Sequence, residues 1–402
     1  MRRPLAALAA ALAAVLDTTA RAAPEDRPAP LVALRDRATE YLGPGRDVPP
    51  PVGLADVRIA FFGPADAGHP EWSEAWRGAT LAVEQANRES RGLPFRLLPA
   101  WSESPWGSGV ADLVKLVYQQ GVWGVLGGVD GVTTHLAEQV VVKARLSLVS
   151  PGDTDPSVNF TAVPWMFTLL PTDDRIAPLL AQALAPGEPW SAVTTTDRDA
   201  AAAWRALRMV RARQRAPAPM QHVALPPRAP GYREAVADLA GSGVRTVVVL
   251  AGPVDSAAIV VALRERGFEG RIVGSAAFGR RIFRERAGSA AEDAVFPLLF
   301  DAESAEAREF VRHYEERWGE PPDFLAAHAY DGARLLIAAV RRAGLNRALV
   351  RDALVALAPW PGATGLVTWD ATGRNERAVT IGAWRGARAC PIALRTPRRD
   401  AR

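Results

Sequence analysis

The chain has 402 residues, of which 49% are hydrophobic and 23% are charged, a composition that excludes a largely disordered protein and allows two hydrophobic cores. The 48 Lys and Arg residues slightly outnumber the 44 Asp and Glu residues, so the formal net charge is +4. The basic residues are scattered and form no stripe interleaved with aromatic residues, so nucleic acid is not expected as a partner.

The first residues have the features of a secretory signal peptide. Arg2 and Arg3 precede a Leu- and Ala-rich run that stops at Asp17, and a bilayer span needs a longer run of about 20 apolar residues. Small residues around Ala22 offer a cleavage site, so we expect a signal peptide over residues 1–23 and a mature protein in the periplasm. A cytoplasmic protein with an Ala-rich start is the alternative.

Residues 24–54 are predicted to form an N-terminal extension and linker. Prolines and glycines cluster there around one possible short helix, 31–42. Cys390 is the one cysteine of the sequence, which excludes an intramolecular disulfide and leaves no cysteine near the expected cleavage site to carry a lipid anchor. We therefore expect a protein that is not embedded in the membrane.

From residue 57 onward, short apolar runs alternate with segments of helical periodicity. Apolar residues recur at helical spacing after Trp72 and again from Val110 to Val117, which predicts helices that cover a sheet. Strands and helices in alternation are typical of a parallel, doubly wound α/β sheet. The predicted strands are 57–62, 95–98, 122–126, 146–149, 192–194, 221–224, 244–250 and 271–274.

After residue 300 the pattern changes. Three helical stretches, 304–318, 324–342 and 346–357, are followed by strand-like runs at 366–369 and 379–384. This tail does not continue a simple repeat, so the C-terminal part is expected to be built differently from the alternating region.

The sequence lacks the motifs of common enzyme classes. It contains no G-x-S-x-G motif, no Walker A loop and no G-x-G-x-x-G motif after the first strand. The histidines are widely separated and none belongs to a paired metal-ligand motif; they are His69, His135, His222, His313 and His328. We therefore expect no catalytic activity, no metal and no cofactor.

Polar loops after predicted strands are the candidate ligand-binding segments, because open α/β sheets bind ligands at the carboxyl ends of their strands. Trp72 follows the first such loop, although its spacing with Trp76 is equally typical of a core aromatic on a helix. Asp130, Gly131 and Thr133 lie where the third strand leads into a helix, whose free N–H groups can hold a polar ligand group. The alternative is that Asp130 or Thr133 caps this helix.

Other loops occupy equivalent places in the pattern. Asp153 and Thr154 follow the fourth strand in an Asp-rich turn. Pro253 and Ala276 belong to loops 252–255 and 274–278, which end strands of the second half of the chain. Each loop by itself is unremarkable.

In their order, these segments resemble one protein family. The motifs that carry the resemblance are RIAFFGP (58–64), GATLAVEQAN (78–87), GVWGVLGG (121–128), LVSPGDTDP (148–156), YDGA (330–333) and GATGLVTWDATG (362–373). Over residues 57–387 the chain resembles the leucine/isoleucine/valine-binding branch of the type I periplasmic binding proteins, the extracellular ligand-binding receptor family.

The resemblance implies two Rossmann-like α/β lobes joined by a three-crossover hinge, with the ligand bound between them. Lobe 1 would comprise residues 55–170 and 301–355, and lobe 2 would comprise residues 171–300 and 356–390. Residues 391–402 would form a C-terminal tail.

The resemblance also suggests roles for lobe 1 residues. Trp72 would be the aromatic residue of the first-strand loop, and the loop from Gly131 to Thr133 would meet a ligand carboxylate. Asp153 and Thr154 would lie in the loop that contacts the ligand through backbone and hydroxyl groups.

In lobe 2 the chain departs from the family pattern. Asp197 is not followed by the Tyr that is common in receptors of α-amino acids, and the usual acidic position is Ala276. A desolvated ammonium group needs a carboxylate or other acceptors. Either Asp153 supplies the carboxylate from the other side, or the ligand has no ammonium group.

The function implied is a periplasmic solute-binding receptor of an ABC importer. It would be a monomer that passes a small amino-acid-like or carboxylate ligand to an inner-membrane ABC permease. A sensing subunit that signals to a membrane receptor or kinase, and an enzyme of unknown chemistry, are the alternatives. The predicted ligand-binding residues are Trp72, Asp130, Gly131, Thr133, Asp153, Thr154, Asp197, Pro253 and Ala276.

Overall fold

The computed structural model describes residues 40–393 except 90, 102–103 and 387. The expected signal peptide, most of the N-terminal extension with its possible helix, and the tail after residue 393 lie outside the described residues. Within the described part, no helix is both long enough and apolar enough to cross a bilayer.

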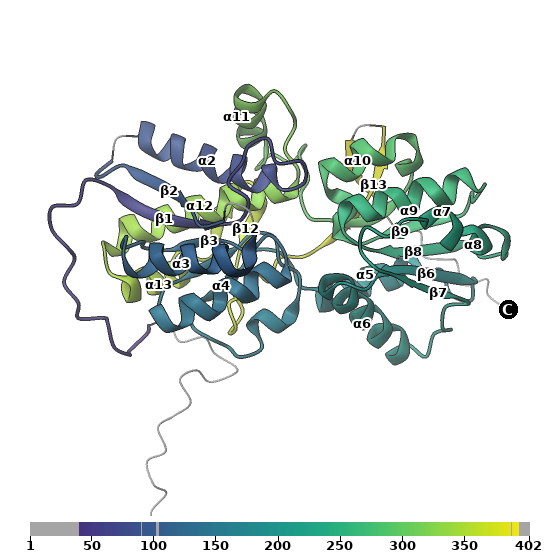
Figure 1. The fold of residues 1–402 in the computed structure, drawn as a ribbon, viewed down its shortest axis with the longest axis horizontal. Coiled ribbons are helices and arrows are strands. Elements are labelled where there is room, and N and C mark those ends of the chain that lie inside the picture. Colours follow the sequence, from purple (N-terminus) through teal and green to yellow (C-terminus); the bar gives the residue numbers. More distant parts are fainter. Residues whose placement is uncertain (1–39, 90, 102–103, 387, 394–402) are drawn as a thin grey trace, which may run out of the picture.

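Lobe 1 is built on a five-stranded parallel sheet in the order β2-β1-β3-β4-β5 (left in Figure 1). Its strands are β1 (Val57–Phe62), β2 (Phe95–Pro99), β3 (Val125–Gly127), β4 (Leu148–Ser150) and β5 (Met166–Thr168). Its helices are α2 (Ser73–Arg88), α3 (Val110–Tyr118), α4 (Gly131–Ala144), α11 (Arg308–Trp318), α12 (Phe324–Ala343) and α13 (Arg347–Ala356).

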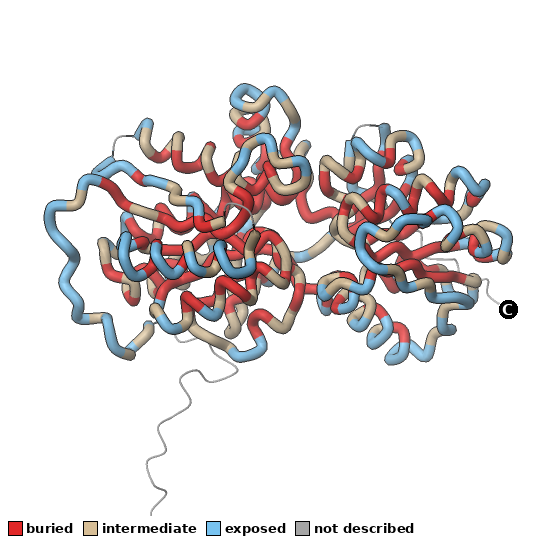
Figure 2. The backbone as a smooth tube through the Cα atoms, in the orientation of Figure 1, coloured by how far each residue is buried: buried red, intermediate tan, exposed pale blue. Residues whose placement is uncertain are grey.

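Alternate side chains of β1 show how the two faces of this sheet are covered. Ile59 and Phe61 belong to the core shared with α2 and α12, whereas Ala60 and Phe62 belong to the core shared with α3 and α4. Both faces are buried, as Figure 2 shows, which explains why every residue of the strand except Arg58 is apolar.

Lobe 2 contains a seven-stranded mixed sheet in the order β14-β13-β10-β9-β8-β6-β7 (right in Figure 1). Strands β13 and β14 are antiparallel to their neighbours, and the other strands pair in parallel. Its strands are β6 (Trp190–Thr195), β7 (His222–Leu225), β8 (Thr246–Leu250), β9 (Arg271–Gly274), β10 (Val295–Leu298), β13 (Thr380–Arg385) and β14 (Arg388–Pro391).

Helices cover this second sheet as well. They are α5 (Asp173–Ala183), α6 (Arg198–Arg213), α7 (Tyr232–Ala235), α8 (Ala237–Gly241), α9 (Pro253–Glu265) and α10 (Arg281–Ala287). Val248 and Leu250 of β8 share a core with α5 and α6, and Val247 and Val249 share a core with α7 to α10. The two-lobed α/β architecture expected from the sequence is therefore confirmed.

The chain passes between the sheets three times: after β5, after β10 and before β13. The last passage lies later than expected. The hairpin of β11 (Trp360–Gly362) and β12 (Gly365–Val367) is tied to lobe 1, because the Asp331 carboxylate accepts hydrogen bonds from the Ala363 and Thr364 N–H groups, each at 2.8 Å. Asn375 Nδ2 also donates to the Leu169 carbonyl at 2.9 Å. We propose that residues 356–375 belong to lobe 1 and that lobe 2 resumes near β13.

Candidate functional site

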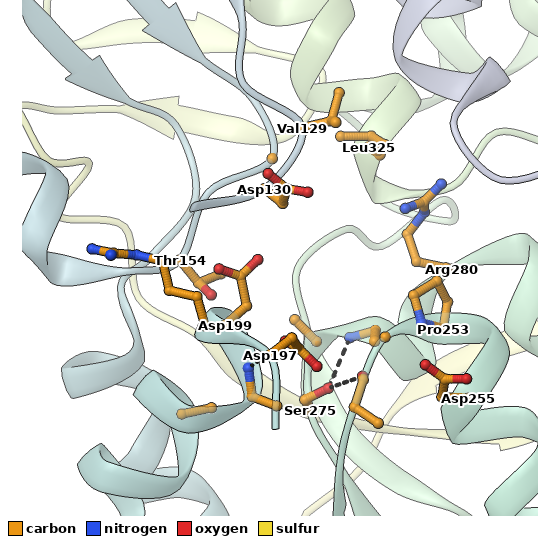
Figure 3. A pocket seen from close by; sticks show the side chains of 18 of the residues that line it. Val129, Asp130, Thr154, Asp197, Asp199, Pro253, Asp255, Ser275, Arg280 and Leu325 are labelled. Carbon is orange, nitrogen blue, oxygen red and sulfur yellow. Dashed lines mark hydrogen bonds between the residues drawn. The ribbon is translucent and has the colours of Figure 1, made fainter. Parts of the chain in front are cut away.

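A cavity of about 380 Å³ lies between the lobes, where strands of both sheets end (Figure 3). Residues at its wall follow β1, β3, β4 and β5 of lobe 1 and β6, β8 and β9 of lobe 2. Six of the nine predicted residues line it: Trp72, Asp130, Thr154, Asp197, Pro253 and Ala276. Gly131, Thr133 and Asp153 are not among the lining residues.

The N-terminus of α4 forms a capping box. Asp130 Oδ1 accepts a hydrogen bond from the Thr133 N–H at 2.7 Å, and Thr133 Oγ1 accepts one from the Asp130 N–H at 3.2 Å. Thr133 is 1% exposed, so its hydroxyl stays within the cap. The expectation that this loop presents free N–H groups is therefore corrected in favour of the capping alternative.

Gly131, the first residue of α4, is contacted from the opposite lobe. Its N–H donates to Asp199 Oδ2 of α6 at 3.2 Å. A Cβ at residue 131 would lie 2.5 Å from Asp199 Oδ1, so only glycine allows this approach. A carboxylate at a helix N-terminus is favourable, and here the protein supplies that carboxylate itself.

Asp153 and Asp173 are buried carboxylates close to Asp199. Asp153 Oδ1 accepts a hydrogen bond from the Asp155 N–H at 2.7 Å, while Asp153 Oδ2 and Asp173 Oδ2 are buried with no partner in the described part of the chain. Burial, reinforced by the charge of Asp199, raises the pKa of both carboxyls well above the usual value. Both carboxyls are therefore harder to ionise than a carboxyl in water.

The pKa of Asp199 is raised to about 7, first by burial and then by the charge of Asp130. Burial also raises the pKa of Asp130, and nearby Asp197 adds to the effect. Asp197 itself caps α6, since its Oδ1 accepts a hydrogen bond from the Ala200 N–H at 3.0 Å. In Figure 3 these three aspartates lie on one side of the cavity, opposite Asp255 and Arg280.

Asp155 has the opposite electrostatic behaviour. Burial alone would raise its pKa, but hydrogen bonds from Ser157 and from the Arg198 guanidinium lower it. Arg198 Nε lies 2.9 Å from Asp155 Oδ2 and comes from α6 of lobe 2. This ion pair is a second direct contact between the lobes.

Trp72 lies at the wall of the cavity under a buried arginine of lobe 2. The Arg280 guanidinium carbon is 5.0 Å from the centre of a Trp72 ring, a cation–π contact. Arg280 Nε also donates to Asp323 at 2.7 Å, and Arg280 Nη2 lies 3.3 Å from Glu74 Oε2. Trp72 also packs against the core of lobe 1, as the core interpretation expects, and its ligand contact stays a prediction.

The remaining predicted residues contribute backbone and small side chains. The Thr154 carbonyl accepts the Asp173 N–H at 2.8 Å, which places the first turn of α5 beside this loop. Pro253 is the first residue of α9, and Ala276 begins a short 3-10 helix capped by Ser275. Ala276 contributes only a methyl group, so residue 276 supplies no carboxylate to the cavity wall.

The cavity residues that were not predicted as ligand-binding include three buried or cleft-facing charged side chains, Asp173, Asp199 and Arg280. Asp173 follows β5, a strand of three residues that was not predicted, so the loop after it was not among the predicted ligand-binding loops. Asp199 stood beside a predicted residue, but nothing local indicated that it reaches the other lobe. Among the described residues, no group of three or more His, Cys, Asp or Glu is arranged to hold a metal ion.

Solved structures share this architecture at low sequence identity. The branched-chain amino acid transporter substrate-binding protein LivJ from Streptococcus pneumoniae, in complex with isoleucine, has a TM-score of 0.75 at 19% identity, covering 84% of this chain and 98% of that chain. The leucine-binding protein LivK from Thermotoga maritima has a TM-score of 0.71 at 18% identity, covering 85% and 98%. A solute-binding protein from R. palustris in complex with benzoate has a TM-score of 0.72 at 14% identity, covering 85% and 96%.

Sequence comparisons identify the family. An amino acid binding protein of Pseudomonas aeruginosa is 30% identical over 125 residues, which span 30% of this chain and 33% of that relative. A family model described as periplasmic binding protein matches residues 56–389, most of the chain. The chain therefore belongs to the periplasmic binding protein family.

Proposed function

We propose that the protein is the solute-binding receptor of an ABC importer and that it captures a small ligand in the cavity between its lobes. The observation that carries the proposal is the cavity itself, because loops from both sheets line it. A ligand that touches both lobes favours the closed arrangement by its differential affinity for that state. The protein would have no catalytic role.

Family membership supports delivery to an inner-membrane ABC permease. LivJ is a transporter substrate-binding protein with isoleucine bound, and the R. palustris structure holds benzoate, so receptors of this architecture accept chemically different ligands. Export to the periplasm is part of the proposal. It predicts that protein recovered from the periplasm starts near residue 23.

Thermal-shift screening followed by small-angle scattering tests the receptor function. Amino acids, amines, carboxylates, amides and polyols would be screened, since a ligand at 100 times its Kd adds about 2.7 kcal/mol to stability. With a compound that raises the Tm, we expect a smaller radius of gyration. An unchanged radius at saturation would contradict capture by hinge closure.

A further inference from the structure

Three carboxylates at the cleft have buried oxygen atoms without a hydrogen-bond partner among the described residues. They belong to Asp153, which is 1% exposed, to Asp173, which is 5% exposed, and to Asp199. Asp173 and Asp199 line the cavity. Asp153 adjoins Asp199, since oxygens of the two residues lie 3.3 and 2.5 Å from the point where a Cβ of Gly131 would stand. A buried acceptor without a donor is unfavourable unless a bound group supplies one.

The arginines that line the cavity do not neutralise these three carboxylates. Arg198 pairs with Asp155, Arg228 pairs with Glu71, and Arg280 pairs with two carboxylates of lobe 1. Within the described part of the chain, the cavity wall contains no other Arg or Lys. The electrostatic field of the cleft therefore favours a cation.

The position expected for a ligand carboxylate is already filled. At the N-terminus of α4, the Gly131 N–H donates to Asp199 and the Thr133 N–H donates to Asp130. A ligand carboxylate would have to displace Asp199 and would then lie close to Asp130 and Asp153. Like charges repel strongly in a site with little water.

We infer that the ligand is an organic ammonium cation without a carboxylate beside its ammonium group, held at the cavity wall by Asp173 and Asp199, with Asp153 as a buried neighbour of Asp199. This inference rests on the proposed receptor function and names the class of ligand. The ammonium N–H groups would donate to the unpartnered carboxylate oxygens. The carbon chain would contact apolar residues of the wall such as Trp72 and Leu170.

Proton exchange gives the inference a second observable. Burial raises the pKa of Asp153, Asp173 and Asp199. The charges of Asp130, Asp155 and Asp197 each raise the pKa of one or more of these three carboxyls further. Arg198 faces the same region but is paired with Asp155. A bound ammonium group stabilises the ionised carboxylates and lowers these pKa values. Binding is therefore expected to release protons and to strengthen as the pH rises towards neutrality.

Three probes that share the same branched carbon chain test which head group the site binds. L-Leucine has both an ammonium group and a carboxylate, 3-methylbutylamine lacks the carboxylate, and 4-methylpentanoate lacks the ammonium group. In calorimetric titrations of the full-length mature protein, we expect the amine to bind at least roughly tenfold more tightly than leucine and the acid not to bind. Titration in two buffers of different ionisation enthalpy should show proton release with the amine.

Two variants test the named residues. Asp173→Asn and Asp199→Asn each remove one ionisable carboxyl at nearly constant volume. We expect each to reduce the affinity for the amine by roughly tenfold or more. Asp238→Asn is the matched control, because Asp238 is exposed on α8 and does not line the cavity. A merely structural acidic cluster would change the Tm in the first two variants and leave amine affinity unchanged.

Several outcomes would overturn the inference. Tighter binding of leucine or of 4-methylpentanoate than of the amine, with loss of that binding in Trp72→Ala, would refute the head-group class and leave the receptor function standing. A Tm increase with calcium chloride but not with the amine would show that the site binds a metal ion and not an organic cation. If no compound of any class raises the Tm, the receptor function fails as well.

Discussion

At the scale of single residues, Trp72 is the cleft side chain with the largest contact surface. We predict that Trp72→Ala weakens ligand binding by about 1–3 kcal/mol, or roughly tenfold to a hundredfold in affinity. The reason is that the substitution removes apolar contact with the ligand and exposes Arg280. Isothermal titration calorimetry measures the change. Trp106→Ala is the control, since Trp106 is 61% exposed on lobe 1 outside the cavity. Wild-type affinity in folded Trp72→Ala would place the binding site elsewhere.

Thr154 tests the loop after β4. Thr154→Val removes a hydroxyl at nearly constant volume, and we predict a loss of affinity of about 1–2 kcal/mol because Thr154 lines the cavity and its hydroxyl lies beside the Asp173 carboxyl. Thr80→Val on α2 is the matched control, because the Thr80 hydroxyl has no described partner and lies outside the cavity. Equal affinities for both variants would exclude a ligand contact by Thr154.

At the residue scale, the sequence indicated which loops reach the cleft better than it indicated what each side chain does there. Trp72, Asp130 and Thr154 line the cavity because they follow strands, and strand ends can be read from apolar runs. The partner of Gly131 could not be predicted in this way. Asp199 is 68 positions away in the sequence and reaches Gly131 only because the lobes face each other.

At the scale of elements, prolines in apolar runs limited the sequence prediction. Strand β1 was predicted with its observed bounds, since five of its six residues are apolar. Strands β5 and β10 were missed because proline argues against a strand: Pro164 lies two residues before β5, and Pro297 lies within β10. The interactions that anchor the β11–β12 hairpin to lobe 1 could not be predicted from local sequence patterns either, because they join residues more than 30 positions apart.

Asp331 of α12 tests that anchoring. Its carboxylate accepts hydrogen bonds from the Ala363 and Thr364 N–H groups and from the Thr364 hydroxyl at 2.7 Å, and it is fully buried. We predict that Asp331→Asn lowers the free energy of unfolding by about 2–4 kcal/mol, because an amide NH₂ would face one of these donors. Urea titration measures the loss, with Asp238→Asn as the control. A loss no larger than that of the control would show that the hairpin is held by other contacts.

At the scale of the whole molecule, the cleft carboxyls couple stability to pH. Because the pKa of Asp199 is raised to about 7 in the folded state, its contribution to stability is fully present below its unfolded pKa, near 4, and is lost as the pH rises through about 7. We therefore predict that the free energy of unfolding of Asp199→Asn equals that of the wild type near pH 4. At about pH 8 it should be higher than that of the wild type by roughly 1–3 kcal/mol. Thermal unfolding across this range measures the difference. A gain that is equal at both pH values would contradict the electrostatic origin.

The contacts between the lobes also affect how fast a ligand can bind. Asp199 with Gly131, and Arg198 with Asp155, join the lobes directly at the cavity. We predict that these contacts must break before a solute enters, so that capture is a gated process whose first step is thermal opening of the protein. The observed association rate should rise with solute concentration only at first and then level off at the opening rate. Uptake by the importer would then be limited, at high solute supply, by the motion of its receptor.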